Sequence, residues 1–401
     1  MHTPTDLNDA RLDSWVRRAL QHRDVVKFST SVVGSSDPGD GFSGKLYFVD
    51  VSATTVKSET HEYSFAIKTS TNLDKKDKFY GMIFRRETFV YKVVVPAFRD
   101  LFEPKFDFWP ECYASIEGEK VLILENLKKV GYVLHNKTKP MPLDHMLLVM
   151  EAYGHWHGLS FLLKKLHPEK YRKIADVLKD EVFLGTLQRV WKNETCMKII
   201  QYSNRVLDDA LKDAQLLRKL KDKLASVPGS INTYLSEEVP DEPYVVVNHG
   251  DCWTNNFMFS YEGEDTSVPT KVAMLDFQVA ILHSPVRDLV HFIYCSISEE
   301  QLPNARRFFE AYYQSLSDIL KRSGCDPEEI FSFSVLADHW KKYSHYGVQL
   351  GVLSLNWCFA KPDAVSDMDN VGLDKLVEEE YKQMYVSRAR AIANLYVGFE
   401  L

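Results

Sequence analysis

Residues 248–256 read NHGDCWTNN, and residues 276–278 read DFQ. An apolar run at 244–247 precedes the first stretch, and residues 257–259 continue it with FMF. The second stretch closes another apolar run, which begins at residue 271. Short apolar runs bounded by turn-forming residues are typical of buried strands. The sequence therefore predicts two short strands flanking a turn, with acidic residues at their ends.

Three polar residues of these stretches, Asp251, Asn256 and Asp276, are the types that phosphoryl transfer requires. One carboxylate orients the acceptor hydroxyl and takes its proton, while an amide oxygen and a second carboxylate hold Mg²⁺ at the phosphates. The pattern favours Asp251 as the base, with Asn256 and Asp276 as metal ligands. For either stretch taken alone, the alternative is structural: Asp251 and Asn256 form the turn, and Asp276 caps a strand end.

A glycine-rich stretch near the N-terminus, GDGFSGK at 39–45, fits the pattern G-x-G-x-x-G with Gly39, Gly41 and Gly44. A Rossmann or Walker loop must lead into a helix, yet residues 46–51 are strand-like. Strand, glycine turn and strand is the kinase arrangement, in which the turn lies over the triphosphate. A hairpin turn that binds no ligand is the alternative.

Lys68 ends the tetrapeptide FAIK, which is close to the V-A-I-K pattern of a strand lysine that reaches the α and β phosphates. Taken alone, a lysine near a strand end is usually solvated. A lysine that holds phosphate in a partly dry cleft needs a carboxylate to fix its rotamer. Glu87 follows Lys68 in the chain and lies on another predicted element, the helix-like stretch 77–95, as the carboxylate partner of such a lysine should. Glu59 and Glu62 fall on or before the strand of Lys68 itself and cannot reach across to it.

The remaining pattern divides the chain into a strand-rich part and a helical part. A short amphipathic helix is expected at 6–23, and strands rich in Val, Phe, Tyr, Thr and Ile are expected at 25–33, 45–56, 62–69, 110–116 and 120–125. The helix-like stretch 77–95 is expected to stop at Pro96. Apolar positions at a period of 3.6 predict helices at 143–165, 204–226, 301–322, 331–355 and 374–396.

The composition excludes several classes of protein. The 401 residues carry 49 Lys+Arg against 56 Asp+Glu, a net charge of -7, so the whole molecule offers no cationic field for nucleic acid or for an anionic membrane. No stretch reaches the ~18 uncharged apolar residues of a membrane span. Six cysteines without a C-x-x-C spacing indicate reduced thiols. We therefore expect a cytoplasmic protein with no nucleic-acid or membrane partner; the sequence is silent about its oligomeric state.

Four elements together resemble one known family, the ecdysteroid kinase-like proteins of insects, which are relatives of the choline and aminoglycoside kinases. These elements are NHGDCWTNN at 248–256, DFQ at 276–278, SPVRDL at 284–289 and LILENL at 122–127. The resemblance implies an α+β protein-kinase-like fold of two lobes, with a β-rich N-terminal lobe over 1–127 and a mainly helical C-terminal lobe over 128–401. It further implies ATP and Mg²⁺ as cofactors, and a small lipophilic acceptor: an ecdysteroid, a xenobiotic alcohol or a glycoside.

The resemblance also assigns roles to single residues. It implies Asp251 as the catalytic base, Asn256 and Asp276 as the Mg²⁺ ligands, Lys68 as the phosphate lysine with Glu87 beside it, Glu125 to Leu127 as the hinge that faces the adenine, and His249 and Asp288 as supports of the catalytic loop. Two positions depart from the family pattern: Cys252 stands where leucine is common, and Gly41 where asparagine is common.

Two other functions remain open on the sequence alone. The first is a catalytically silent kinase-like protein that binds a lipophilic ligand. The second is a protein kinase, which the sequence disfavours because no A-P-E element follows Asp276 and the stretch 284–288 comes too soon for a long activation segment. An aromatic cluster is either ordinary core or the wall of an acceptor pocket: Trp340, Tyr343, Tyr346, Trp357 and Phe359.

Overall fold

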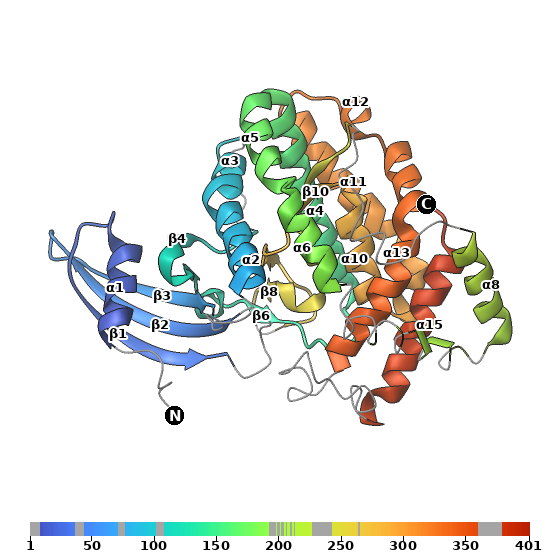
Figure 1. Ribbon diagram of the computed structural model, residues 1–401, viewed down its shortest axis with the longest axis horizontal. Helices are drawn as coiled ribbons and strands as arrows, with labels where there is room; N and C mark the ends of the chain where they lie inside the picture. Colours follow the sequence, from blue (N-terminus) through green and yellow to red (C-terminus); the bar gives the residue numbers. More distant parts are fainter. Residues whose placement is uncertain are drawn as a thin grey trace.

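The computed structural model describes residues 9–36, 44–70, 77–101, 108–191, 198, 201, 204–205, 207–208, 211, 213–226, 243–263, 265–359 and 379–401. Figure 1 shows an antiparallel sheet with one helix beside it at one side of the molecule and a large group of helices at the other. Strand β8 (Phe257–Ser260), which follows the first acidic motif, lies between these two parts (Figure 1). The first motif therefore ends close to the place where the two parts meet.

The N-terminal sheet has five antiparallel strands in the order β1-β2-β3-β5-β4. They are β1 (Val25–Ser35), β2 (Lys45–Thr55), β3 (Thr60–Thr69), β5 (Val121–Glu125) and β4 (Cys112–Ile116). Alternate residues of β2 are buried, as the period of two in its sequence requires. Helix α1 (Asp9–Leu20) packs the apolar side chains of Leu12, Trp15 and Val16 against this buried face. The strands thus follow the predicted ranges closely.

The helix that follows β3 does not stop at Pro96, and this expectation is wrong. Helix α2 (Asp77–Phe89) continues through a π-helical turn, η1 (Val90–Val94), into α3 (Val95–Arg99). In the wider turn, the N–H of Val95 donates to the carbonyl oxygen of Val90. A proline inside an α-helix lacks an N–H and collides with the carbonyl oxygen four residues earlier. The π-turn changes the hydrogen-bond register just before Pro96, which then stands in the first turn of α3.

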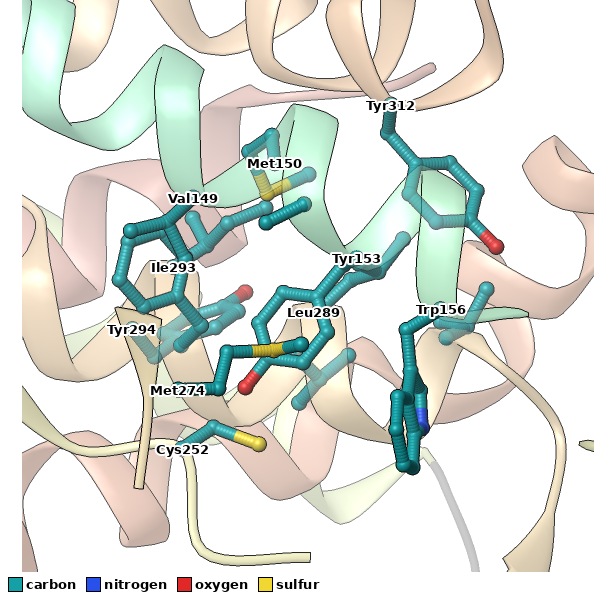
Figure 2. Packing of buried hydrophobic residues seen from close by; sticks show 14 of the residues in the cluster. Val149, Met150, Tyr153, Trp156, Cys252, Met274, Leu289, Ile293, Tyr294 and Tyr312 are labelled. Carbon is teal, nitrogen blue, oxygen red and sulfur yellow. The ribbon is translucent and has the colours of Figure 1, made fainter. Parts of the chain in front are cut away.

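The C-terminal part is built from long helices around a buried core. The helices are α4 (Leu143–Leu166), α5 (Pro168–Leu178), α6 (Glu181–Trp191), α8 (Ala214–Ala225), α10 (Val286–Ser296), η5 (Glu299–Asn304), α11 (Ala305–Arg322), α12 (Pro327–Phe331), α13 (Phe333–Phe359), η7 (Glu379–Tyr381) and α15 (Lys382–Gly398). Figure 2 shows how Tyr153 of α4 and Met274 lie above Cys252 in this core. In the described part of the chain, no helix is long and apolar enough to cross a membrane.

The predicted strands around the motifs are present. Strand β7 (Val246–Asn248) pairs with β10 (Ile281–His283), while β8 (Phe257–Ser260) pairs with β9 (Lys271–Met274) and with β6 (Val133–Leu134). The first motif therefore connects β7 to β8, and the second connects β9 to β10. Both motifs are turns between neighbouring small sheets.

The expected α+β architecture, a β-rich N-terminal part followed by a mainly helical part, is confirmed. The boundary at residue 127 stays a prediction. Of the aromatic cluster, Trp340, Tyr343, Tyr346 and Phe359 are buried in the core, as the first of the two interpretations has it. The predicted helices at 204–226 and 374–396 lie partly outside the described residues, and their described parts are helical over α8 and α15.

Candidate active site

Helix α4 fixes the strand that leads into the HGD turn. The indole N–H of Trp156 donates to the carbonyl oxygen of Val247 at 2.7 Å, and the N–H of Val247 donates to Ser160 Oγ at 2.9 Å. Both side chains come from consecutive turns of α4 and are fully buried. Because hydrogen bonds in a dry interior are costly to break, the turn starts from a rigid support.

Asp288, in the first turn of α10, holds the HGD turn itself. Its carboxylate accepts the backbone N–H of His249 at 2.7 Å and that of Gly250 at 3.0 Å. His157 Nε2 lies 3.2 Å from the same carboxylate, and Cys252 Sγ donates to it at 3.2 Å. Burial alone would raise the pKa of Asp288, but the contacts with His157 and the backbone lower it overall. Asp288 is therefore an ionised carboxylate beneath the turn, and it holds several groups of the turn at once.

The HGD and DFQ turns are locked together. His249 Nε2 lies 2.7 Å from the carbonyl oxygen of Leu275, and His249 Nδ1 accepts the N–H of Asp251 at 3.2 Å. Burial lowers the pKa of His249, so the ring is neutral and carries its proton on Nε2. Gly250 has φ +87°, and a Cβ there would come 2.2 Å from the carbonyl oxygen of Val279. Only glycine permits this approach of the two turns.

Asp251 lies in this supported turn, and its pKa is raised above the ordinary value. Burial, and next the charge of Asp276, raise the pKa of Asp251 to about 7, while hydrogen bonds from Asn256 and Gln278 oppose the rise. Asn256 Nδ2 donates to Asp251 Oδ2 at 2.9 Å and to its carbonyl oxygen at 2.8 Å. A carboxylate with a pKa close to 7 is suited to accept a proton near neutral pH.

Lys68 joins the sheet to the DFQ turn. Its Nζ lies 2.8 Å from Glu87 Oε2 and 2.8 Å from Asp276 Oδ1. Burial alone would lower the pKa of Lys68, but the two carboxylates raise it above the ordinary value. Asp276 has φ 64°, a left-handed conformation that aspartate adopts more readily than most residues. The predicted partnership of Lys68 and Glu87 is thus present, and Asp276 extends it.

Helix α2, which carries Glu87, is fixed from its other side by Arg86. The guanidinium of Arg86 is buried, donates to the carbonyl oxygen of Val177 at 3.1 Å, and lies 3.9 Å from the ring centre of Phe183. Ile83 of α2 packs against Phe183 in a small separate core. These contacts attach α2 to the α5–α6 segment of the helical part (Figure 1). The position of Glu87 is therefore set by the helical part as well as by Lys68.

The glycine turn is described only at its base. Gly39 and Gly41 lie outside the described residues. A Cβ on Gly44 would come 2.0 Å from the carbonyl oxygen of Thr69, so Gly44 is required by the close approach of β2 and β3 beside Lys68. The packing of the two strands is therefore sufficient to require glycine at position 44, without any role in ligand binding.

The predicted hinge continues directly from β5. Asn126 donates its N–H to the carbonyl oxygen of Ser64, and its Nδ2 to Ser64 Oγ, both at 3.0 Å. Glu125 Oε2 accepts the N–H of Glu111 at 3.4 Å. Leu127 is buried against Met258, the second residue of β8. The hinge therefore contacts both the sheet and the strand that follows the first motif.

Asn256 and Asp276, the two predicted metal ligands, each carry one side-chain oxygen of the type that Mg²⁺ prefers. Asn256 uses its Nδ2 for Asp251, and Asp276 uses its Oδ1 for Lys68. Among the described residues nothing pairs with the remaining Asn256 Oδ1 and Asp276 Oδ2. In that part of the chain no group of three or more His, Cys, Asp and Glu residues could hold a metal ion. Mg²⁺ suits a pair of protein oxygens, because it keeps several waters and binds phosphate oxygens as well.

Sequence reasoning missed several supports of the site. His291 Nδ1 accepts the N–H of Cys252 at 3.3 Å, and Arg86 fixes α2. A histidine or arginine within an apolar helical stretch was the only available sign of such a support. Its partner could not be identified from the sequence because that partner lies more than thirty residues away in the chain. Gln278 was visible in the DFQ motif without an assigned role.

Comparisons with known proteins identify the family of this chain. A family model described as the ecdysteroid kinase-like family matches residues 38–325. No curated protein matches the sequence. One solved structure, the crystal structure of an aminoglycoside-3'-phosphotransferase of type VIII, shares 12% identity over 86% of this chain and 98% of its own, with a TM-score of 0.28. On the family match, which spans the glycine turn and both motifs, this chain belongs to the ecdysteroid kinase-like family.

Proposed function

We propose that the protein transfers the γ-phosphoryl group of ATP to a hydroxyl group of a small lipophilic molecule. The observation that carries the proposal is the convergence of Lys68, Asp276 and Asp251 at the junction of the two parts. Lys68 bonds Asp276 directly, and the charge of Asp276 acts on Asp251. Family membership supports a small-molecule kinase of this general type.

Lys68, Asn256 and Asp276 would hold the nucleotide and its metal. Lys68 Nζ, released in part from Asp276, would bind phosphate oxygens while Glu87 keeps its rotamer. Asn256 Oδ1 and Asp276 Oδ2 would bind Mg²⁺. When bound, Mg²⁺ and ATP supply charge neutralisation and the transferred group, so the protein needs chiefly to position its reactants.

Asp251 would act on the acceptor. Its carboxylate orients the hydroxyl in line with the γ-phosphorus and takes the hydroxyl proton. A bond forms between the acceptor oxygen and phosphorus, the bond to the β-phosphate oxygen breaks, and ADP leaves. The raised pKa of Asp251, about 7, makes this carboxylate a stronger base than an exposed aspartate.

The acceptor class follows from the family, whose description names an ecdysteroid kinase. We propose an ecdysteroid or another lipophilic alcohol, such as a xenobiotic or its glycoside. A protein acceptor is disfavoured because α10 begins at Val286, soon after Asp276, which leaves little chain for an activation segment. We also propose the cytoplasm as the location, since the described cysteines are free thiols.

A screen of lipophilic alcohols and glycosides with labelled ATP and Mg²⁺ tests the proposal. We expect a product that has gained one phosphoryl group with the wild-type protein, and none with Asp251→Asn. A mixed protein extract serves as the parallel acceptor. Labelled proteins without labelled small molecules, or equal turnover by Asp251→Asn, would refute the proposal.

A further inference from the structure

Lys68 forms ion pairs with two carboxylates that differ in their access to solvent. Its Nζ lies 2.8 Å from Glu87 Oε2 and 2.8 Å from Asp276 Oδ1. The side chain of Glu87 is only 3% exposed, whereas that of Asp276 is 26% exposed. A cation from solution can therefore reach Asp276 but not Glu87. Asp276 is the carboxylate for which Lys68 and a dissolved cation compete.

The ammonium of Lys68 is held firmly beside Asp276. Lys68 lies on β3, the middle strand of the N-terminal sheet, which pairs with β2 on one side and with β5 on the other. Its second partner, Glu87, lies on α2, which Arg86 attaches to the helical part. If the ammonium moved away, Glu87 would become an unpaired buried charge, and this is costly. Glu87 therefore keeps a positive charge next to Asp276.

One carboxylate at this depth does not serve two cations well. The charge of Asp276 is already shared with Lys68 at hydrogen-bond distance. A divalent cation on the same carboxylate is attracted by Asp276 and repelled by the ammonium, and a partly buried site screens both forces much less than water does. The phosphates of a nucleotide change this balance, because they bring negative charges that bind the ammonium.

We infer that Lys68 excludes divalent metal from Asp276 in the free protein, and that the exclusion ends when the phosphates of a nucleotide bind the ammonium. The inference rests on the proposed function. Lys68 then couples the two ligands, because the metal binds weakly alone and tightly together with the nucleotide. By thermodynamic reciprocity, the metal strengthens the binding of the nucleotide by the same factor.

A titration with Mn²⁺ as the probe, in the absence of nucleotide, tests the exclusion. The electron paramagnetic resonance signal of free Mn²⁺ gives the fraction bound. We expect Lys68→Met to bind Mn²⁺ about tenfold more tightly than wild type, and Lys68→Arg, which keeps the charge, to stay within about twofold of wild type. An unchanged affinity for Mn²⁺ in Lys68→Met would overturn the inference.

Lys221→Met is the matched control for the loss of a lysine from an ion pair. Lys221 Nζ lies 3.0 Å from Asp208 Oδ2. Lys221 belongs to α8, which lies on the opposite side of the helical part from the sheet (Figure 1). Its affinity for Mn²⁺ should equal that of wild type. A gain equal to that of Lys68→Met would show a general effect of charge and would overturn the inference.

Two double variants locate the effect at the ion pairs of Lys68. Lys68→Met combined with Asp276→Asn should lose the gained affinity, and a gain that persists would place the metal elsewhere and overturn the inference. If Lys68→Met does not fold because Glu87 is left unpaired, Lys68→Met combined with Glu87→Gln removes both charges of the buried pair. This variant should show the same tightening, and its absence would overturn the inference.

The titration with nucleotide separates this inference from the proposed function. A non-hydrolysable ATP analogue is added, and the Mn²⁺ that the analogue binds without protein is subtracted. Wild type should then bind Mn²⁺ at least as tightly as Lys68→Met, whereas weaker binding by wild type would overturn the inference. None of these titrations measures transfer. Exclusion and its relief in a wild type that phosphorylates no acceptor would therefore refute the proposed function and support the inference.

Discussion

Gly250 and Val279 lie so close that a Cβ on Gly250 would come 2.2 Å from the carbonyl oxygen of Val279. These residues belong to the two turns that carry Asp251 and Asp276. The contact therefore sets the separation of the two acidic groups, and Asp288 fixes Gly250 from beneath at 3.0 Å. The site consists of two turns in close contact, and Lys68 of the sheet forms an ion pair with Asp276 in the second turn.

Gly250→Ala should lower the free energy of unfolding by about 3 kcal/mol, since it adds both a collision and a strained φ of +87°. Gly263→Ala is the matched control, because Gly263 has φ +74° and nothing within 4 Å of a new Cβ. We expect about 1 kcal/mol for the control. Chemical denaturation measures both. Equal losses in the two variants would show that the collision with Val279 is not important.

Arg86→Met should destabilise the protein by about 2 kcal/mol, since it removes a buried hydrogen bond and the contact with the ring of Phe183. The adjacent Arg85 is exposed, so Arg85→Met should change stability by less than about 0.5 kcal/mol. The apparent Kd for ATP should rise only in Arg86→Met, because α2 also positions Glu87. Denaturation and nucleotide titration check the pair, and identical behaviour of the two variants would contradict the role of Arg86.

The stability of Asp251→Asn should depend on pH in a defined way. Burial raises the pKa of Asp251 from 3.8 to about 7, so between these values the folded protein retains a proton that the unfolded chain releases. This linkage makes the wild type less stable as pH rises through that window. Asn is free of the penalty. Asp251→Asn should thus gain stability relative to wild type from pH 4 to pH 7, in ligand-free protein studied by denaturation. A stability difference between variant and wild type that stays constant from pH 4 to pH 7 would contradict this prediction.

Asp276→Asn should abolish the Mg²⁺-dependent part of nucleotide binding. The variant retains a residue type that tolerates the left-handed φ of 64°, while it removes the charge that both Lys68 and a cation require. We expect an ATP-induced rise in Tm in wild type that grows with Mg²⁺, and a rise in the variant that Mg²⁺ leaves unchanged. A full Mg²⁺ response in Asp276→Asn would place the cation elsewhere.

The strands of the sheet and the acidic motifs could be predicted because each is marked by residues that are neighbours in the sequence. Alternating burial in β2 and the apolar runs before Asp251 and Asp276 each depend on neighbours in the chain. The pairing of β7 with β10 was not predictable in this way, since residue spacing does not specify which short strand lies beside which. The pairing of β7 and β10 depends on contacts made only in the folded protein.

The structure around Pro96 and the burial of Arg86 could not be predicted from local sequence patterns either. A proline after a helical pattern ordinarily marks an end, and the sequence contains no signal for the π-turn that carries the helix past it. Arg86 looks like any basic residue on a helix, and its burial depends on α5 and α6, far along the chain. By contrast, the pairing of Lys68 with Glu87 was predictable, because a known chemical need links the two residue types.

The most direct test of the phosphotransfer account is a crystal structure of the protein with Mg²⁺ and a non-hydrolysable ATP analogue. The account predicts the adenine against the hinge at Glu125 to Leu127, the metal on Asn256 and Asp276, and the terminal phosphate facing Asp251. An analogue bound away from Lys68, or a terminal phosphate directed away from Asp251, would contradict it.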